Sequence, residues 1–414
     1  MLSVRRLSDV NEALNVIEKE GILRLKPTWV ARSFGLPGAR IGLRPDEVFV
    51  SGRGPIVERW IASTVEAANP SSPGEGLSYV VAGIDGGEYL VSLSELVRLG
   101  GEEILGKDVI KKYGEWHLLA KLLDYKVPIP FHLHHREEQA KLVNKRPKPE
   151  AYYYPPELNR DPGVFPYTFF GLSPGTEPVE VRSRLEIWDR GDNHILDLSQ
   201  AYAQRAGTGW IVPAGVLHAP GSLVTFELQL ASDVNAFYQS ARYDGVPLPK
   251  DLLFADFPPD RKGDLDFALE LIDWKENTDP FFKLNHYLEP TPAEDPEITL
   301  KEGYLNRWVI YDHELLGARE LRLKPRAETT IKDDQPFVIF AISGHGEVDG
   351  KPLEGSVNVS LSELTYDEYF VPRGKAKEGV KISNKSPASE LVLILYGPNV
   401  STAASIRPAR KRAS

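Results

Sequence analysis

The spacing of apolar residues predicts three helices at intervals along the chain. Residues 1–20, 90–100 and 264–277 repeat apolar side chains at three- and four-residue intervals, which is the period of a helix with one buried face. Gly100 and Gly101 stand at the end of the second stretch. We expect them to end that helix, because glycine disfavours helix continuation.

Most of the remaining sequence consists of short apolar runs separated by glycine and proline. This pattern covers residues 29–62, 129–245 and 298–398 and is typical of short strands joined by tight turns. The proline-rich residues 288–297 predict a linker. Residues 116–125 form one further apolar run.

Two of the β-rich blocks have similar sizes and predict a bicupin. The fold expected is mainly β, with two barrel or jelly-roll domains and a small helical insertion or layer. A chain of 414 residues is too long for one ordinary core and suits such a division. The predicted parts are an N-terminal segment that packs on the barrels (1–125), a first barrel (126–245), a helical connector with the linker (246–297), a second barrel (298–400) and a basic tail (401–414).

Composition and charge remove several classes of function. The chain has no cysteine, so any metal site must use His, Asp or Glu. A net charge of −10 argues against a nucleic-acid partner, and the lack of an apolar run of about 18 residues argues against a membrane span. The first residues lack the apolar core of a signal peptide, and we therefore expect a cytoplasmic protein.

Candidate metal ligands fall in three segments of the first β block. The segment PIPFHLHHREE contains His132 and His134, which point to one side of a strand because side chains alternate, while His135 points away. Glu150 precedes an aromatic strand and occupies the place expected of a hairpin partner. His218 follows the turn at Ala214-Gly215 in GWIVPAGVLHAPG, a pattern that predicts a second hairpin. Each residue alone is compatible with an ordinary surface or packed side chain.

Together these segments supply three imidazoles and one carboxylate. Such a set suits one divalent ion: Zn²⁺, Mn²⁺, Fe²⁺ or Ni²⁺. Residues 298–400 contain only the isolated His313 and His345. We therefore expect the metal-binding, catalytic cupin at residues 126–245 and a metal-free second barrel.

The sequence around these residues resembles that of the bacterial type I phosphomannose isomerases over about residues 25–245. The segment WHLLAKLLDYKVPIPFHLHH is similar to the passage of that family from an apolar helix into the first ligand strand. The segments KPEAYYY, VPAGVLHA and FELQLASD are similar to its Glu-ligand segment, its last ligand histidine and the Glu-x-Gln-x-Ser-Ser-Asp run that follows. A less specific match is formed by Glu58, Trp60 and Ser63.

The resemblance assigns roles residue by residue. It implies that His134, Glu150 and His218 bind the metal and that Lys148 is the active-site lysine; His132 stands where the family has a glutamine ligand. The arginine that follows the Ser-Ser-Asp run in the family is missing here. The nearest substitute is Arg242, which we predict together with Lys148 as a catalytic and substrate-binding residue.

The function implied by the resemblance is metal-dependent interconversion of an aldose and a ketose through an enediolate. The substrate is a hexose or a hexose 6-phosphate, of the mannose 6-phosphate and fructose 6-phosphate type. Two alternatives stay open. A three-histidine, one-glutamate cupin can be a dioxygenase, and the missing arginine is compatible with a sugar-binding cupin that has no catalytic activity.

Overall fold

The computed structural model describes residues 2–50, 52–69 and 72–398. The predicted basic tail at 401–414 lies outside the described residues. The described part is mainly β, as the sequence predicts, and its long strand ladders are all antiparallel. In these parts of the chain no helix has the length and apolar character needed to cross a bilayer.

Two sheets build the half of the molecule that contains the candidate site. The larger sheet has eight strands: β16 (Tyr287–Leu288), β12 (Gly209–Val212), β9 (Glu150–Tyr153), β14 (Thr225–Leu230), β7 (Leu118–Leu123), β4 (Gly54–Ile61) and β2 (Thr28–Ala31) in spatial order, with β3 (Phe49–Val50) beside β4. The smaller sheet has five strands in the order β11 (Gln200–Ala203), β10 (Tyr167–Phe170), β13 (His218–Ala219), β8 (His132–Leu133) and β15 (Ala236–Phe237).

The other half contains a nine-stranded and a four-stranded sheet. The first runs in the order β17 (Thr291–Pro292), β18 (Tyr304–Ile310), β19 (Ala318–Leu323), β26 (Leu391–Tyr396), β21 (Phe337–Ser343), β24 (Glu368–Val371), β1 (Leu23–Lys26), β5 (Tyr79–Ile84) and β6 (Gly87–Ser92). The second runs in the order β20 (Glu328–Ile331), β25 (Val380–Asn384), β22 (His345–Val348) and β23 (Lys351–Glu354).

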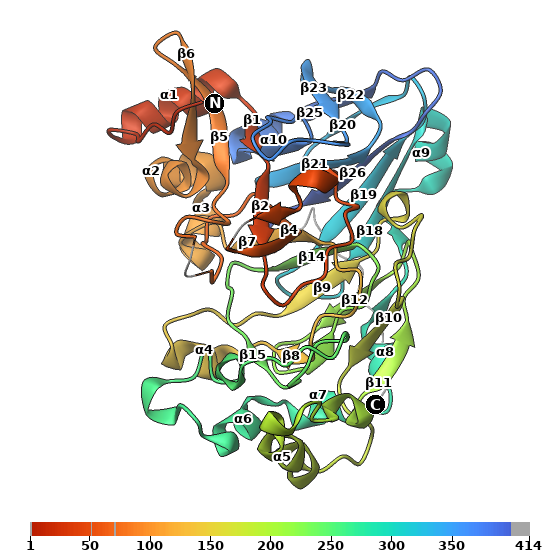
Figure 1. The fold of residues 1–414 in the computed structure, drawn as a ribbon. Helices are drawn as coiled ribbons and strands as arrows, with labels where there is room; N and C mark the ends of the chain where they lie inside the picture. Colours follow the sequence, from red (N-terminus) through yellow and green to blue (C-terminus); the bar gives the residue numbers. More distant parts are fainter. Residues whose placement is uncertain (1, 51, 70–71, 399–414) are drawn as a thin grey trace.

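The four sheets stack as layers, and apolar and aromatic side chains pack between them. Phe170 of the five-stranded sheet packs on Trp210 of the eight-stranded sheet, with 4.8 Å between ring centroids. Phe226 on the eight-stranded sheet lies 6.0 Å from Tyr396 on the nine-stranded sheet. A third apolar cluster joins the nine-stranded sheet to the four-stranded one. The molecule is thus two β-sandwiches packed back to back (Figure 1).

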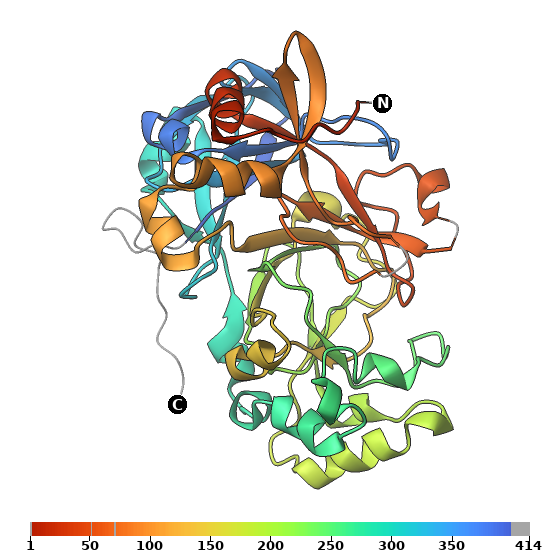
Figure 2. The ribbon, with the colours of Figure 1, turned by 90° about the vertical axis from the view of Figure 1, so that its left-hand side faces the viewer.

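Helices cover the ends and flanks of this stack. Figure 2 shows the red and orange helices α1 to α3 along the upper flank and the yellow-green and green helices α5 to α7 at the lower end. The ten α-helices are α1 (Val10–Glu20), α2 (Leu93–Leu105), α3 (Lys107–Tyr113), α4 (Glu137–Leu142), α5 (Pro178–Glu186), α6 (Leu265–Leu271), α7 (Trp274–Asn277), α8 (Phe282–His286), α9 (Pro296–Glu302) and α10 (Arg373–Glu378), counted over the described residues.

Two sequence-based expectations about helices require correction. The second predicted helix begins only at Leu93 and continues beyond the glycine pair to Leu105, with Gly101 in a non-helical conformation at φ 44° and ψ −116°. Residues 116–125 contain no helix; Leu118–Leu123 is a strand in which every residue is buried. Burial on both faces removes the alternation that identifies a strand, so a continuous apolar run is ambiguous in the sequence.

The proline-rich stretch at 288–297 is structured. Tyr287–Leu288 pairs with β12 at the edge of the eight-stranded sheet, and Thr291–Pro292 pairs with β18 at the edge of the nine-stranded sheet. Pro296 then begins α9. This stretch therefore joins the two sandwiches through paired strands. Its prolines are compatible with strand pairing because they lie at sheet edges.

The N-terminal part of the chain contributes to both sandwiches. Strands β2, β3, β4 and β7 belong to the eight-stranded sheet, whereas β1, β5 and β6 complete the nine-stranded sheet beside β24. In Figure 1 the red strand β1 accordingly lies next to the blue C-terminal strands. The predicted domain boundaries stay a prediction, and each sandwich combines segments that are distant in the sequence.

Candidate metal centre

Three imidazole rings on the five-stranded sheet lie side by side. His132 on β8 faces His218 on β13 across the strand ladder, and their ring centroids are 4.2 Å apart. The ring of His134 lies 5.0 Å from each of the other two. One ring nitrogen from each residue falls within 4.8 Å of the others, and all three side chains are buried.

Side-chain alternation along β8 and β13 explains this convergence. Leu133 and Ala219 belong to the apolar cluster that also contains the buried residues of α5 and α6. Their neighbours His132, His134 and His218 must therefore face the interior of the sandwich, because side chains alternate along a strand. His135 follows the outward direction, as expected, and its Nε2 lies 3.0 Å from the carbonyl of Asp256.

Backbone carbonyls fix the tautomer of all three rings. The Nδ1 atoms of His132, His134 and His218 lie 2.8, 2.7 and 2.8 Å from the carbonyl oxygens of Pro130, Val234 and Val216. Because a carbonyl only accepts, each Nδ1 must donate a proton, so that in the neutral imidazole the lone pair is on Nε2. A hydrogen bond from Nδ1 to a backbone carbonyl orients an imidazole for metal binding through Nε2.

Glu150 reaches the same point from the opposite sheet. Its Oε1 lies 2.8 Å from His134 Nε2 and its Oε2 lies 3.4 Å from His218 Nε2. The phenol of Tyr152 donates a 2.6 Å hydrogen bond to Oε2. The carboxylate and the three imidazoles thus meet between the two layers of the sandwich.

Both hairpins predicted from the sequence are wrong in their pairing. Strand β9, which begins with Glu150, pairs with β12 and β14 and not with β8. Strand β12 lies in the eight-stranded sheet, whereas β13 lies in the five-stranded one. The turn at Ala214-Gly215 therefore crosses from one layer to the other. Sequence proximity suggested neighbouring strands, but closure of a sandwich requires such crossings.

Lys148 lies directly against the carboxylate and one imidazole. Its Nζ is 2.8 Å from Glu150 Oε1 and 2.9 Å from His134 Nε2. Burial lowers the pKa of the Lys148 ammonium, but Glu150 and the neighbouring acids more than offset this, so that the pKa is raised. Lys148 is therefore a charged ammonium group.

Burial controls the charge state of the imidazoles. It lowers the pKa of His132 well below its usual range and, together with the nearby Lys148, lowers the pKa of His134 to about 3. For Glu150, burial favours the neutral acid, yet Lys148 and His134 hold its pKa well below the usual range. His132 and His134 are therefore neutral and Glu150 is ionised, which are the states that bind a metal ion.

The donor atoms of this group fit a divalent transition metal. His218 Nε2 and Glu150 Oε1 are buried and take part in no well-aligned hydrogen bond, a state that costs free energy unless another group satisfies them. Three imidazole nitrogens and one carboxylate oxygen match the preferences of Zn²⁺ and its neighbours in the periodic table. Within the described residues, these histidines form the one group of three or more His, Cys, Asp or Glu side chains close enough to share an ion.

A cavity of about 450 Å³ extends from this group, including the part open to solvent. We call it the site cavity. Seven charged side chains line it: Arg32, Glu58, Lys121, Lys148, Glu150, Glu227 and Asp233. Its remaining lining is formed by His132, His134 and Asn235 and by the apolar or aromatic residues Phe34, Leu123, Tyr125, Ile129, Pro220 and Phe237.

The charges that line the site cavity shift the pKa values of two buried acids, Asp233 and Glu227, in opposite directions. Burial alone would raise the pKa of Asp233, but Arg32 and Lys121 lower it below the usual range. Glu227 has only partly compensating neighbours: burial and the negative charge of Glu150 raise its pKa to about 7. Its Oε1 lies 3.4 Å from Lys121 Nζ but accepts no aligned hydrogen bond.

Sequence analysis missed several of these charged residues. Glu58, Glu227 and Asp233 belong to the segments that resemble the family, but no role was assigned to them. Arg32 and Lys121 were not recognised. A signal did exist, because Lys121 and Glu227 are single charges within strands whose other residues are mostly apolar. A charged residue inside a buried strand requires a partner or a function.

Arg242 is not among the residues that line the site cavity. Its Nε donates a 3.0 Å hydrogen bond to Asp244 Oδ1 in the turn that follows. Its assignment as a catalytic and substrate-binding residue stays a prediction.

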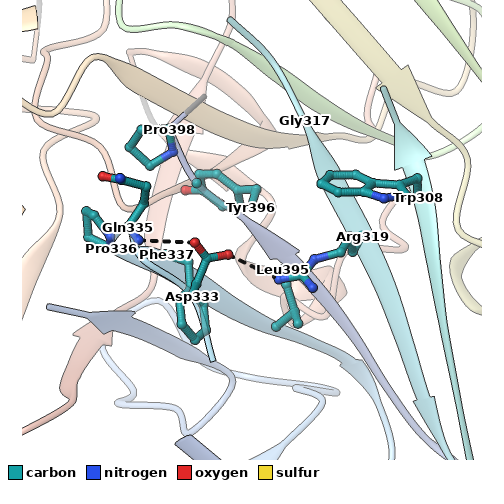
Figure 3. Close-up of a pocket in the computed structure, with 11 residues that line it drawn as sticks. Trp308, Gly317, Arg319, Asp333, Gln335, Pro336, Phe337, Leu395, Tyr396 and Pro398 are labelled. Atoms are coloured by element: carbon teal, nitrogen blue, oxygen red, sulfur yellow. Dashed lines mark hydrogen bonds and ion pairs between the residues drawn. The ribbon is translucent and has the colours of Figure 1, made fainter. Parts of the chain in front are cut away.

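A second pocket lies in the other sandwich and contains no comparable histidine group. Figure 3 shows that it is lined by aromatic and polar residues, among them Trp308, Gln335 and Tyr396. Arg319 and Asp333 form an ion pair there, with 3.4 Å between Nη2 and Oδ2.

Comparisons with known proteins find similarity in structure only. No family model matches the sequence, and no curated protein matches it. A solved mannose 6-phosphate isomerase from Bacillus subtilis superposes with a TM-score of 0.60 and 16% identity, covering 91% of this chain and 99% of that one.

A variant of phosphomannose isomerase from Salmonella typhimurium superposes with a TM-score of 0.59 and 12% identity, covering 91% of this chain and 99% of that one. At such identities the likeness establishes the fold and leaves the activity to be tested. The chain has the two-cupin fold of the phosphomannose isomerases.

Proposed function

We propose that this protein is a divalent-metal-dependent sugar isomerase that interconverts an aldose and a ketose, a hexose or a hexose 6-phosphate. One observation carries the proposal: three imidazoles and one ionised carboxylate converge in one buried group, of which His132, His134 and Glu150 line the site cavity. The shared fold with solved phosphomannose isomerases supports the same reaction class.

In this proposal His132, His134, Glu150 and His218 hold the ion. A divalent ion bound there supplies a Lewis acid that polarises a carbonyl and a neighbouring hydroxyl oxygen, with Zn²⁺ as the first candidate. The side chains of this group are buried, and the lower dielectric constant of such a site strengthens electrostatic interactions inside it.

Isomerisation requires removal of a proton from the carbon beside the carbonyl and its return to the neighbouring carbon. Glu227 is the carboxylate placed for this transfer, because it lines the site cavity and its Oε1 accepts no aligned hydrogen bond. A base that accepts and returns the same proton serves both directions of the reaction.

Lys148 is proposed to stabilise the charge that develops on the substrate oxygens. The ammonium group is held 2.8 Å from Glu150 Oε1, so it needs little rearrangement during the reaction. Preorganised positive charge of this kind acts mainly on the transition state.

The test combines metal analysis with a substrate screen. We expect purified wild type to contain about one divalent ion per chain and to convert an aldose or its 6-phosphate in an NMR assay. In the His218→Ala variant, metal affinity should fall by more than the about 10–100-fold cost of losing an outer-shell partner. His345→Ala, on an exposed residue of β22, is the matched control and should keep metal and activity.

Three outcomes contradict the proposal. A wild-type protein that converts no sugar is not an isomerase, and sugar binding without conversion would identify the sugar-binding alternative. Full metal content and activity in His218→Ala would remove the ligand assignment. Bound iron with oxygen consumption would instead support the dioxygenase alternative.

A further inference from the structure

Every nitrogen of the Arg32 guanidinium is already occupied by carboxylates of the site cavity. Its Nε and Nη2 donate to Glu58 at 3.0 and 3.3 Å. Its Nη1 and Nη2 donate to Asp233 at 3.2 Å. The side chain is only 7% exposed. Arg32 therefore stabilises two buried acids and offers no free fork to an anionic ligand.

The other two cations of the cavity are placed in the same way. Lys121 Nζ lies 3.4 Å from Glu227 Oε1 and 3.9 Å from Asp233 Oδ1, over the ring of Trp60. Lys148 lies against Glu150. The cavity thus has no cationic side chain without an acidic neighbour.

The charges of the lining favour a neutral ligand. Four carboxylates face three cations, so the lining itself carries one net negative charge when all the acids are ionised. A bound divalent ion would bring this to a single positive charge, which is too little to balance a phosphate dianion. A phosphate dianion would enter beside four carboxylates and would compete with them for the donors of Arg32 and Lys148. Placing like charges together in a site of low dielectric is strongly unfavourable.

A hydrogen-bond acceptor of the site cavity that has no aligned donor also favours a neutral sugar as the ligand. Glu227 Oε1 is a buried acceptor without an aligned donor, and a sugar hydroxyl is a donor. The apolar side of the lining, which includes Phe34, Ile129 and Phe237, suits the C–H face of a sugar.

We infer that the site cavity takes an unphosphorylated sugar and rejects the corresponding sugar phosphate. The inference rests on the proposed function for the reaction, and it narrows that function to the neutral aldose and ketose. It follows from the contacts of Arg32, Lys121 and Lys148 with the cavity acids.

Binding and turnover are measured separately on the full chain loaded with Zn²⁺. The binding probes are D-mannitol and D-mannitol 1-phosphate, open-chain polyols that cannot isomerise. We expect mannitol to bind at least about tenfold more tightly than its phosphate in calorimetry, a difference set by charge repulsion. Tighter binding of the phosphate overturns the inference. So does failure of mannitol to bind up to about 10 mM, roughly ten times the upper end of common KM values.

Turnover of D-mannose and of D-mannose 6-phosphate distinguishes the two proposals. Conversion of mannose in preference to its phosphate supports both. Preferred conversion of the phosphate overturns the inference and leaves the isomerase function in place. If neither is converted while mannitol binds more tightly than its phosphate, the isomerase function falls and the neutral ligand class stands.

A charge variant tests the cause of the selectivity. In the wild type the Ala68 amide donates to Asp233 at 2.8 Å, and Asp233→Asn keeps an oxygen that can accept this hydrogen bond. The substitution removes one of the negative charges beside Arg32 and Lys121. We expect mannitol 1-phosphate to bind at least about tenfold more tightly than in wild type. Asp333→Asn removes one charge from the Arg319 pair of Figure 3, remote from the site cavity, and should change neither probe. Unchanged phosphate binding in Asp233→Asn would overturn the electrostatic explanation.

Discussion

The phenol of Tyr152 fixes the one carboxylate of the candidate metal centre. Its hydroxyl donates to Glu150 Oε2 at 2.6 Å, and both groups are buried. We predict that Tyr152→Phe lowers metal affinity by about 10–100-fold without unfolding the protein, because the change removes only an outer-shell hydrogen bond. Competition with a chelator of known affinity measures the change.

Tyr153 provides the matched control. It follows Tyr152 on β9 and points to the opposite face, where its hydroxyl donates to Glu320 at 2.5 Å. Tyr153→Phe should therefore affect stability and leave metal affinity unchanged. Equal metal affinity in both variants would show that Tyr152 has no role in orienting Glu150.

The carboxyl group of Glu227 is proposed to carry the proton between the two carbons. In Glu227→Gln we expect kcat to fall by at least about 100-fold, the lower end of what general acid–base catalysis contributes, while metal content stays at the wild-type value. Glu137→Gln, on the exposed face of α4, should retain full activity. If Glu227→Gln turns over substrate at the wild-type rate, another group must move the proton.

At the scale of elements, a buried charged cluster joins the two central sheets. Arg59 on β4 binds Asp367 with two hydrogen bonds of 2.6 and 2.7 Å, and Glu368 at the start of β24 accepts from the Ala62 amide at 2.8 Å. Burial raises the pKa of Glu368 from 4.5 to about 7. The folded protein therefore binds this proton more tightly than the unfolded chain.

The sign of the pH dependence follows from this shift. The contribution of Glu368 to stability is complete below pH 4.5, its ordinary pKa, and is lost as the pH rises through about 7. We predict that the free energy of unfolding falls by about 2 kcal/mol between about pH 5 and about pH 8 because of this residue. Urea titrations of Glu368→Gln should lack that part of the decrease.

Glu320→Gln is the contrasting variant. Burial alone would raise the pKa of Glu320, but Arg322 and the other partners lower it. Its contribution is therefore present above its ordinary pKa and lost in acid. Glu320→Gln should lower stability at neutral pH and keep the decrease between about pH 5 and about pH 8. An unaltered decrease in Glu368→Gln would contradict the assignment.

At the scale of the whole molecule, the nine-stranded sheet needs both ends of the chain. Strand β24 pairs with β21 on one side and with the N-terminal strand β1 on the other. We predict that a fragment of residues 298–398 does not fold alone, because the loss of β1, β5 and β6 exposes the long edge of a buried sheet. Circular dichroism and light scattering should show no cooperative thermal transition and a tendency to aggregate.

The full chain serves as the control, with a cooperative transition under the same conditions. A soluble fragment with a sharp transition would show that residues 298–398 are an independent domain. The predicted boundary at residue 298 would then separate folding units as well as sequence blocks.

Part of the candidate site could be predicted from the sequence, because it depends only on the alternation of side chains along one strand. His132 and His134 are two residues apart, and strand geometry alone places them on one face. Their neighbour His135 points away for the same reason, as its contact with Asp256 shows. The β-rich pattern similarly predicted two barrel or jelly-roll domains, since short apolar runs separated by glycine and proline turns are typical of such folds.

Which strands pair and which charges meet was decided only by the tertiary structure. The turn after β12 and the pairing of β9 bring His218 and Glu150 together from different sheets, and Arg32 and Asp233, 201 residues apart, meet in the site cavity. A local pattern specifies which way a side chain faces along its own strand. It carries no information about the strand on the opposite layer, because that contact forms only when the sheets close on each other and exclude water.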